Sequence, residues 1–167
     1  MTEIFDYLFL GSKKDCFSHS FLITNSINCV ISISIDHIPF PKEFNVLRLA
    51  FDDIPTLDLT PFFEQSVAFI EKNKDHGKIL VHCTKGVSRS ASVVLYYLMF
   101  ITNKTLKESF TFLAKKRPII HPNLGFFLQL LEYEKESGLS PEPSFHPWEY
   151  FKCSKEKYLR EWSLDSY

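Results

Sequence analysis

Cys83 and Arg89 are the two side chains of this chain whose types and spacing are best suited to chemistry. A cysteine reacts as its thiolate, and a nearby cation or helix N-terminus favours that form over the thiol. An arginine guanidinium is a planar fork that binds two oxygens of one phosphate. Because Arg89 follows Cys83 by six positions, the pair predicts a loop that binds a phosphate group and attacks it through sulfur.

The residues between this pair are expected to complete a phosphate-binding loop. Backbone N–H groups near a helix N-terminus can form a concave anion site, and Gly86 permits a positive φ and a close approach of the backbone to a ligand. The same positive field would hold Cys83 as a thiolate, which suits in-line attack on phosphorus without a metal ion. The predicted phosphate-binding residues are Thr84, Lys85, Gly86, Val87, Ser88 and Arg89.

The segments on either side of this loop predict a strand before it and a helix after it. Residues 78–83 contain an apolar run typical of a buried strand, and residues 91–99 are apolar enough for a buried helix. Thr60, followed by a proline, predicts a helix N-cap, and Thr105 with Glu108 predicts a capping box. Further strands are predicted at residues 29–35 and 46–50, and an edge strand or a hairpin at residues 4–10. Helices are predicted at residues 15–27, 60–74, 105–117 and 124–137.

The order of these elements predicts the fold class. Strands that alternate with helices early in the chain, followed by helices alone, indicate an α/β (α+β) fold with a central, mostly parallel sheet flanked by helices. We expect residues 1–140 to form one catalytic domain, followed by a C-terminal tail, residues 141–167, that is rich in proline and aromatic residues. This tail is expected to pack on its own domain or to dock on a partner, and the oligomeric state stays open.

The composition is that of a globular protein without an obvious macromolecular partner. Of 167 residues, 45% are hydrophobic and 23% are charged, with a formal net charge of -1, so neither nucleic acid nor an anionic membrane is indicated as a partner. No apolar run approaches the roughly 18 residues of a membrane span. The four cysteines form no C-x-x-C pair, so no structural zinc, metal or disulfide framework is expected. Free thiols predict a reducing compartment, the cytoplasm, with nuclear access left open.

The motif His-Cys-x-x-Gly-x-Ser-Arg-Ser at residues 82–90 resembles the signature of cysteine-dependent protein phosphatases, specifically the dual-specificity phosphatases. The resemblance covers roughly residues 3–138 and is carried by Tyr7–Ser12, Val30–Ile33, Arg117-Pro118, His121–Phe126 and Gln129–Leu131. The Pro-Asn-x-Gly-Phe stretch within it points to the dual-specificity branch. The resemblance implies a protein tyrosine phosphatase-like fold and hydrolysis of phosphotyrosine and phosphoserine or phosphothreonine on proteins, with no cofactor.

The resemblance also implies roles for individual residues. Cys83 would be the nucleophile that forms a cysteinyl-phosphate, and Arg89 would bind the phosphate and the charge of the transition state. The hydroxyl of Ser90 would donate a hydrogen bond to the Cys83 sulfur and ease its departure in the second step. His82 is expected to hold the loop from behind it. Asn123 is expected either to brace the loop backbone or only to cap the last helix.

A general acid is needed as well, because a serine, threonine or tyrosine oxygen is a poor leaving group unless it is protonated. Asp52, Asp53 and Asp58 compete for this role. In the family pattern the acid lies about ten residues before a pair of aromatic residues, here Phe62-Phe63, which selects Asp53 with Asp52 next. Asp58 is expected to stabilise the loop or the start of the following helix.

Two alternatives to a protein phosphatase remain. The first is a pseudophosphatase that binds a phosphoprotein without turnover, which the presence of Cys83, Arg89 and a candidate acid disfavours. The second is a phosphatase for a non-protein substrate such as a phosphoinositide or an RNA 5′-phosphate. Lipid-directed relatives tend to carry two basic residues between the cysteine and the arginine, whereas Lys85 is the only one here.

Overall fold

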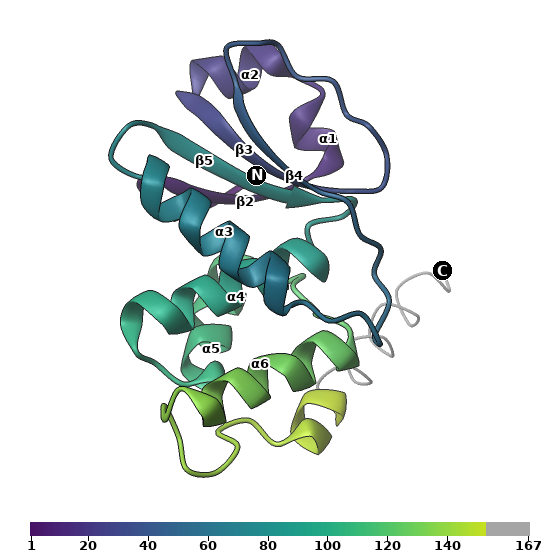
Figure 1. The fold of residues 1–167 in the computed structure, drawn as a ribbon, viewed down its shortest axis with the longest axis vertical. Coiled ribbons are helices and arrows are strands. Elements are labelled where there is room, and N and C mark those ends of the chain that lie inside the picture. Colours follow the sequence, from purple (N-terminus) through teal and green to yellow (C-terminus); the bar gives the residue numbers. More distant parts are fainter. Residues whose placement is uncertain (153–167) are drawn as a thin grey trace, which may run out of the picture.

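The computed structural model describes residues 1–152, and a five-stranded sheet lies at its centre (Figure 1). The strand order is β1-β2-β5-β3-β4, in which β1 is antiparallel to β2 and all other neighbours are parallel. The predicted mostly parallel sheet flanked by helices is therefore confirmed. The strands are β1 (Thr2–Phe5), β2 (Leu8–Ser12), β3 (Ile27–Ile33), β4 (Asn45–Leu49) and β5 (Lys78–Cys83).

The helices cover both faces of this sheet. Figure 1 shows α1 and α2 on one side of it and the four longer helices on the other. The helices are α1 (Lys13–Cys16), α2 (His19–Thr24), α3 (Thr60–Asn73), α4 (Arg89–Thr102), α5 (Leu106–Lys116) and α6 (Leu124–Glu136). The central strand β5 therefore has a helical layer on each face, and its side chains alternate between two apolar clusters. Ile79 and Val81 belong to the larger cluster, and Leu80 belongs to the smaller one.

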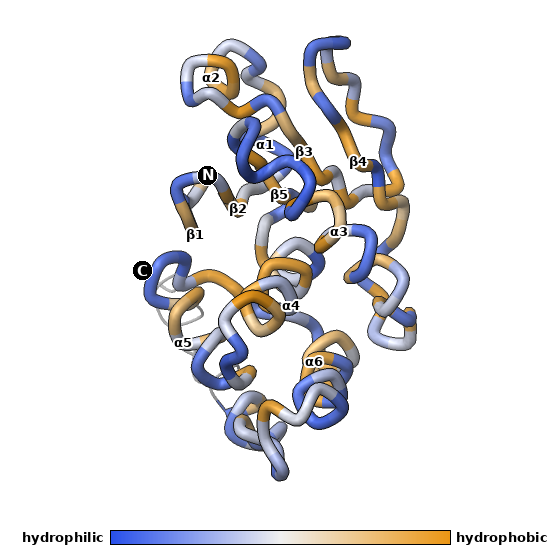
Figure 2. The backbone as a smooth tube through the Cα atoms, turned by 60° about the vertical axis from the view of Figure 1, so that its left-hand side comes forward, coloured by the Kyte–Doolittle hydropathy of each residue, from blue (hydrophilic) through white to orange (hydrophobic). Residues whose placement is uncertain are grey.

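This arrangement explains why the strand before the loop is almost wholly apolar. Ile79, Leu80 and Val81 are all completely buried, as expected of a parallel strand that is covered on both faces. The hydropathy colouring in Figure 2 shows the same pattern, with apolar stretches through the centre and hydrophilic turns at the outside. The carboxyl ends of β2 and β5 meet at one edge, where Ser12 pairs with Cys83.

Two predictions about helices are wrong in detail. The single helix expected at residues 15–27 is two short helices, because the Ser18 hydroxyl caps α2 by accepting a hydrogen bond from the Phe21 N–H at 3.4 Å. Thr60 is not the N-cap of α3, which is Leu59. The carboxylate of Asp58 instead accepts the Thr60 N–H at 2.9 Å. The capping box at Thr105 is confirmed, since its side chain and that of Glu108 each bond the other's backbone.

The first part of the predicted tail lies against the helices. Phe145 and Tyr150 are 8% and 3% exposed and belong to the larger apolar cluster, together with residues of α4, α5 and α6. A short helical turn begins at Pro147 and lies beside α6 in Figure 1. The rest of the tail, residues 153–167, lies outside the described residues. The division of the chain at residue 140 stays a prediction.

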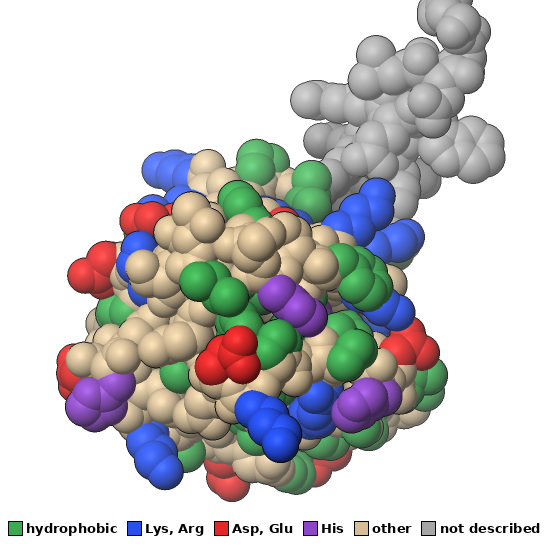
Figure 3. All heavy atoms as spheres, turned by 90° about the horizontal axis from the view of Figure 1, so that it is seen from above, with side chains coloured by type: hydrophobic (Ala, Val, Ile, Leu, Met, Phe, Trp, Pro, Cys, Tyr) green, Lys and Arg blue, Asp and Glu red, His purple; other side chains and the backbone are tan. Residues whose placement is uncertain are grey.

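The charges on the surface and the lengths of the apolar helices can be compared with the expectations from the sequence. On the face drawn in Figure 3, acidic, basic and apolar side chains are interspersed. This agrees with a formal net charge of -1 for the whole chain. Across residues 1–152, no helix is both long and apolar enough to cross a membrane.

Candidate active site

Cys83 ends β5 and lines a pocket of about 480 Å³. Its sulfur is buried and accepts two hydrogen bonds, from the Gly86 N–H at 3.3 Å and from the Ser90 hydroxyl at 3.1 Å. Both donors stabilise negative charge on sulfur. The predicted pairing of Ser90 with Cys83 is thus present in the structure. The pocket is lined by Asp53, Cys83, Thr84, Lys85, Val87, Ser88, Arg89, His121 and Asn123.

Gly86 has the backbone conformation that the sequence predicts. Its φ is +69°, a value that residues with a Cβ rarely adopt. A Cβ at this position would lie 2.4 Å from the Gly11 carbonyl oxygen and 2.6 Å from the Arg117 guanidinium. Glycine is therefore required here both for its φ and for the close approach of β2.

Arg89 begins α4 and its side chain is nearly buried, with 7% of the residue exposed. Its guanidinium is held on two sides, because Nη1 donates to the Phe51 carbonyl at 3.0 Å and Nη2 donates to the Thr84 hydroxyl at 2.8 Å. Asp52 adds an ion pair at 3.7 Å. Within residues 1–152 the buried Nε has no hydrogen-bond partner. Arg89 is therefore held in one orientation, and its guanidinium, which has five N–H donors, keeps donors beyond the two used in these hydrogen bonds.

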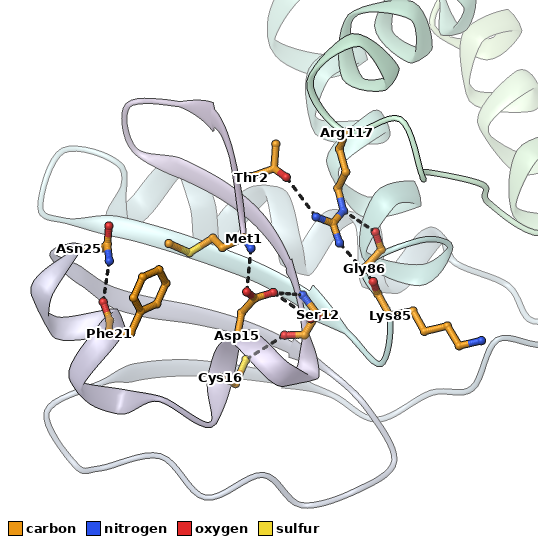
Figure 4. A network of polar contacts seen from close by, with 10 residues as sticks. All are labelled: Met1, Thr2, Ser12, Asp15, Cys16, Phe21, Asn25, Lys85, Gly86 and Arg117. Atoms are coloured by element: carbon orange, nitrogen blue, oxygen red, sulfur yellow. Dashed lines mark hydrogen bonds and ion pairs between the residues drawn. The ribbon is translucent and has the colours of Figure 1, made fainter.

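Arg117 holds the predicted phosphate-binding loop, residues 84–89 (the phosphate loop), through hydrogen bonds to two of its carbonyls (Figure 4). Its Nε donates to the Gly86 carbonyl at 2.8 Å, Nη2 donates to the Lys85 carbonyl at 3.2 Å, and Nη1 donates to the Thr2 hydroxyl at 3.1 Å. Because the C=O and N–H of a peptide unit point in opposite directions, the Lys85 carbonyl turned toward Arg117 leaves the Gly86 N–H turned away from Arg117, and this N–H donates to the Cys83 sulfur. The sequence marks Arg117 as the end of a helix and, with Pro118, as part of the family resemblance, but neither observation predicts this contact with the loop.

Of the three candidate acids, Asp53 is the one that lines the pocket with Cys83. Its Oδ1 accepts hydrogen bonds from the Ser88 hydroxyl at 2.7 Å and from the Asn123 side-chain amide at 2.6 Å. Asp52 is half exposed and pairs with Arg89. Asp58 lies at the start of α3, where the hydrogen bond from the Thr60 N–H lowers the pKa of its carboxyl.

Asn123 caps the last helix, and its contact with the loop is to a side chain, not to the loop backbone. Its side-chain oxygen accepts the Phe126 N–H at 3.0 Å and so caps α6. Its backbone N–H donates to the Ser88 hydroxyl at 2.9 Å, which joins it to the phosphate loop. Its side-chain amide also bonds Asp53. Asn123 therefore connects the loop, the candidate acid and the last helix.

His82 lies behind the loop and is completely buried. Burial lowers its pKa to about 4, an effect larger than the opposing influence of the Cys83 backbone, so the ring is neutral near pH 7. In the described part of the chain, neither ring nitrogen has a hydrogen-bond partner. The ring lies near Phe40, with centroids 6.3 Å apart. In the described part of the chain, His82 therefore contacts its surroundings through packing of its ring and not through a ring hydrogen bond.

Comparison with known proteins agrees with this geometry. Residues 8–136 match the family described as dual specificity phosphatase, catalytic domain. The chain belongs to this family. The resemblance predicted from residues 82–90 is thereby confirmed, and the phosphatase fold with it. Among residues 1–152 no group of three or more histidine, cysteine, aspartate or glutamate side chains is arranged to hold a metal ion.

Three known proteins illustrate the similarity. The chain is 38% identical over 141 residues to human dual specificity protein phosphatase 16, covering 81% of this chain but only 21% of that protein. The crystal structure of DUSP15 has a TM-score of 0.79 and 31% identity, covering 82% of this chain and 88% of that one. A human tyrosine phosphatase-like serine/threonine/tyrosine-interacting protein has a TM-score of 0.77 and 32% identity, covering 82% and 97%.

Proposed function

We propose that this dual specificity phosphatase domain hydrolyses phosphate monoesters on the tyrosine, serine and threonine residues of proteins through a cysteinyl-phosphate. The observation that carries the proposal is that the Cys83 sulfur, the Arg89 guanidinium and the Asp53 carboxyl line one pocket. A nucleophile, an anion-binding group and an acid are the three parts that this chemistry needs. Family membership supports the same assignment.

In the first step, the Cys83 thiolate attacks phosphorus, and an S–P bond forms as the P–O bond to the substrate breaks. The N–H groups of the loop and the Arg89 guanidinium bind the non-bridging oxygens and stabilise the charge that they carry in the transition state. Asp53, in its protonated form, donates its proton to the leaving oxygen. Its position is set by the hydrogen bonds that it accepts from Ser88 and Asn123.

In the second step, water attacks the cysteinyl-phosphate while the Asp53 carboxylate accepts one of its protons. The S–P bond breaks, and the electron pair returns to sulfur as thiolate. The Ser90 hydroxyl, 3.1 Å from Sγ, and the Gly86 N–H, 3.3 Å from it, stabilise that leaving group. Inorganic phosphate is released, and the resting enzyme is regenerated.

The phosphoprotein substrate is favoured over a phosphoinositide by the charge of the loop. Lys85 is the only lysine between Cys83 and Arg89, so the loop offers little extra positive charge for a second phosphate.

The three cysteines in the described part of the chain are all free thiols. This supports our proposal of a cytoplasmic location, with nuclear access left open.

A phospho-binding pseudophosphatase is the second candidate. One similar structure is of a protein named as phosphatase-like and interacting, at 32% identity, so the fold alone does not guarantee turnover. Cys83, Arg89 and Asp53 in one pocket favour turnover here. The hydrolysis experiment that follows separates a phosphatase from a pseudophosphatase.

The decisive experiment is hydrolysis of p-nitrophenyl phosphate by wild type and by Cys83→Ser. We expect the substitution to lower kcat by at least about 10³-fold, because a neutral hydroxyl replaces the nucleophile. Cys29→Ser is the matched control, since Cys29 is a buried cysteine on β3 that does not line the pocket. Retained turnover in Cys83→Ser would contradict the mechanism, and an inactive wild type that still binds phosphopeptide would support the pseudophosphatase.

The substrate class is tested with phosphotyrosine peptides, phosphothreonine peptides and a short-chain phosphoinositide under the same conditions. We expect both peptides to be turned over faster than the lipid, and EDTA to leave the rates unchanged because no step uses a metal ion. Preferential turnover of the phosphoinositide would overturn the assignment of protein as substrate.

A further inference from the structure

The C-terminal segment, residues 141–152, lies beyond the residues that match the family, which end at residue 136. It is nevertheless joined to the helices through Glu134, which is 1% exposed. This carboxylate accepts hydrogen bonds from the Leu106 N–H at 2.6 Å and from the Ser144 N–H at 2.9 Å. It also accepts a hydrogen bond from the Ser144 hydroxyl at 2.5 Å. A buried carboxylate is costly unless donors surround it. The two Ser144 bonds fasten the segment to α6, and the Lys107 N–H, which donates to the Ser144 hydroxyl at 3.1 Å, fastens it to α5.

Two aromatic residues then bury the segment. Phe145 packs edge-on against Phe110 and Phe127, with ring centroids 5.4 and 5.3 Å apart. Tyr150 stacks flat on Phe127, with centroids 3.9 Å apart and an angle of 6° between the rings. It also stacks on His121 at 5.1 Å and 19°. Tyr150 therefore lies between the core and a residue that lines the pocket.

The hydroxyl of Tyr150 donates a hydrogen bond to the Pro122 carbonyl. Pro122 is the middle residue of a short segment, residues 121–123, that contacts both the phosphate loop and Asp53. The His121 N–H donates to the Val87 carbonyl at 2.8 Å, and Asn123 donates to the Ser88 hydroxyl at 2.9 Å and to the Asp53 carboxylate at 2.6 Å. A displacement of this segment would therefore move the phosphate loop and the acid together.

We propose that Tyr150 is a positioning residue that holds residues 121–123, and through them Asp53 and the phosphate loop, in the geometry needed for phosphoryl transfer. This inference rests on the proposed function. It assigns to the C-terminal segment, outside the family match, a part in catalysis beyond burial of apolar surface. The reason is the hydroxyl, since a phenylalanine would bury the same ring and leave the Pro122 carbonyl without this donor.

The test is Tyr150→Phe in the full chain, assayed with p-nitrophenyl phosphate and with phenyl phosphate. The first leaving group needs little protonation and the second needs much more, so a misplaced acid slows the second reaction preferentially. We expect kcat to fall about three-fold with p-nitrophenyl phosphate and about ten-fold with phenyl phosphate, because small displacements of positioned groups are costly. We expect the affinity for inorganic tungstate, a phosphate analogue, to fall by about three-fold.

The matched control is Tyr97→Phe. Tyr97 is a completely buried tyrosine, and its hydroxyl donates to Glu71 at 2.8 Å and lies 3.0 Å from the Tyr7 hydroxyl. It does not line the pocket. This variant loses a buried hydroxyl as Tyr150→Phe does, but its ratio of rates for the two substrates should equal that of wild type.

The inference is overturned if Tyr150→Phe, shown by its circular dichroism to be folded, keeps both the wild-type ratio of rates and the wild-type tungstate affinity. If the wild-type protein has no phosphatase activity, the proposed function fails, and tungstate binding alone then decides about Tyr150. A weaker affinity in Tyr150→Phe than in Tyr97→Phe supports its hold on the loop, and equal affinities refute it.

Discussion

The two sides of the candidate active site are built from different kinds of sequence. One side consists of the consecutive residues 82–90, which bring the sulfur, the loop N–H groups and the Arg89 guanidinium together through one strand–loop–helix unit. The other side is assembled from distant segments, since Asp53 is bonded by Ser88 35 positions later and by Asn123 70 positions later. The first side depends on local backbone geometry, and the second depends on how loops pack.

This difference predicts how each side responds to substitution. A change on the local side should alter the chemistry itself, because the reacting groups are adjacent in the chain. A change on the assembled side should remove or misplace the proposed acid while the cysteine and the loop stay intact, so its effect should vary with the leaving group of the substrate. Three substitutions test this contrast, from the largest expected effect to the smallest.

The largest effect is expected from Asp53→Ala on the assembled side. Loss of the acid should lower kcat for phenyl phosphate by about 10²-fold and lower it much less for p-nitrophenyl phosphate, whose leaving group needs little protonation. The measurement is steady-state kinetics with both substrates, beside phosphate binding by calorimetry, which should survive.

Asp52→Ala is the matched control, because Asp52 is adjacent in sequence and pairs with Arg89 at 3.7 Å. Its kcat should fall by less than about five-fold with either substrate, as expected for a partly exposed ion pair. If Asp52→Ala shows the leaving-group dependence and Asp53→Ala does not, the general acid is Asp52 and the assignment to Asp53 is wrong.

An intermediate effect concerns the stability of the local side and its dependence on pH. The folded-state pKa of His82 is lowered to about 4 from 6.5, so at pH 5 the unfolded chain binds a proton that the folded chain does not. Above pH 6.5 the ring is neutral in both states, and the folded state keeps its full stability. As the pH falls from 6.5 toward 4, protonation of the ring in the unfolded chain lowers the free energy of unfolding. Between pH 7 and pH 5 this loss should be about 2 kcal/mol.

Urea unfolding of wild type and of His82→Gln at the two pH values measures this contribution. The variant will be less stable at both, but the part of the pH dependence that comes from the imidazole should be missing from it. Equal pH dependence in the two proteins would show that the His82 ring titrates alike in the folded and unfolded states.

The smallest effect is expected from Arg117→Met, which removes the hydrogen bonds to the Lys85 and Gly86 carbonyls while keeping an unbranched apolar stem. The loop N–H groups would be less firmly oriented, and kcat/KM for p-nitrophenyl phosphate should fall by about ten-fold. Lys116→Met is the control, because the ammonium of this neighbour donates to the Glu3 carbonyl at 3.5 Å and lies over the Phe112 ring at 5.4 Å, and neither contact involves the loop. Wild-type kinetics in Arg117→Met would mean that the local side holds its own geometry unaided.

Prediction from sequence was most successful where neighbouring residues decide the structure. Strand β5 has the predicted bounds of residues 78–83, because an apolar run of that length is recognisable by itself. The capping box at Thr105 was predicted from a spacing of three residues. Thr60 was misassigned as an N-cap because the Asp58 carboxylate competes for the same helix start. The helix at residues 15–27 was misassigned because Ser18 begins a new helix within it.

By itself, the sequence determined the order of the residues that we propose to react on the local side, and it indicated the family to which the chain belongs. A strand, a glycine-containing loop and a helix N-terminus are specified by interactions within a few residues. The family spacing favoured Asp53, but only the tertiary structure shows the contacts that hold Asp53 in the pocket and that Arg117 and Tyr150 lie against the site. Those contacts join residues 31 positions apart at Gly86 and 28 positions apart at Pro122, and no local pattern encodes a contact that forms only when distant loops pack together.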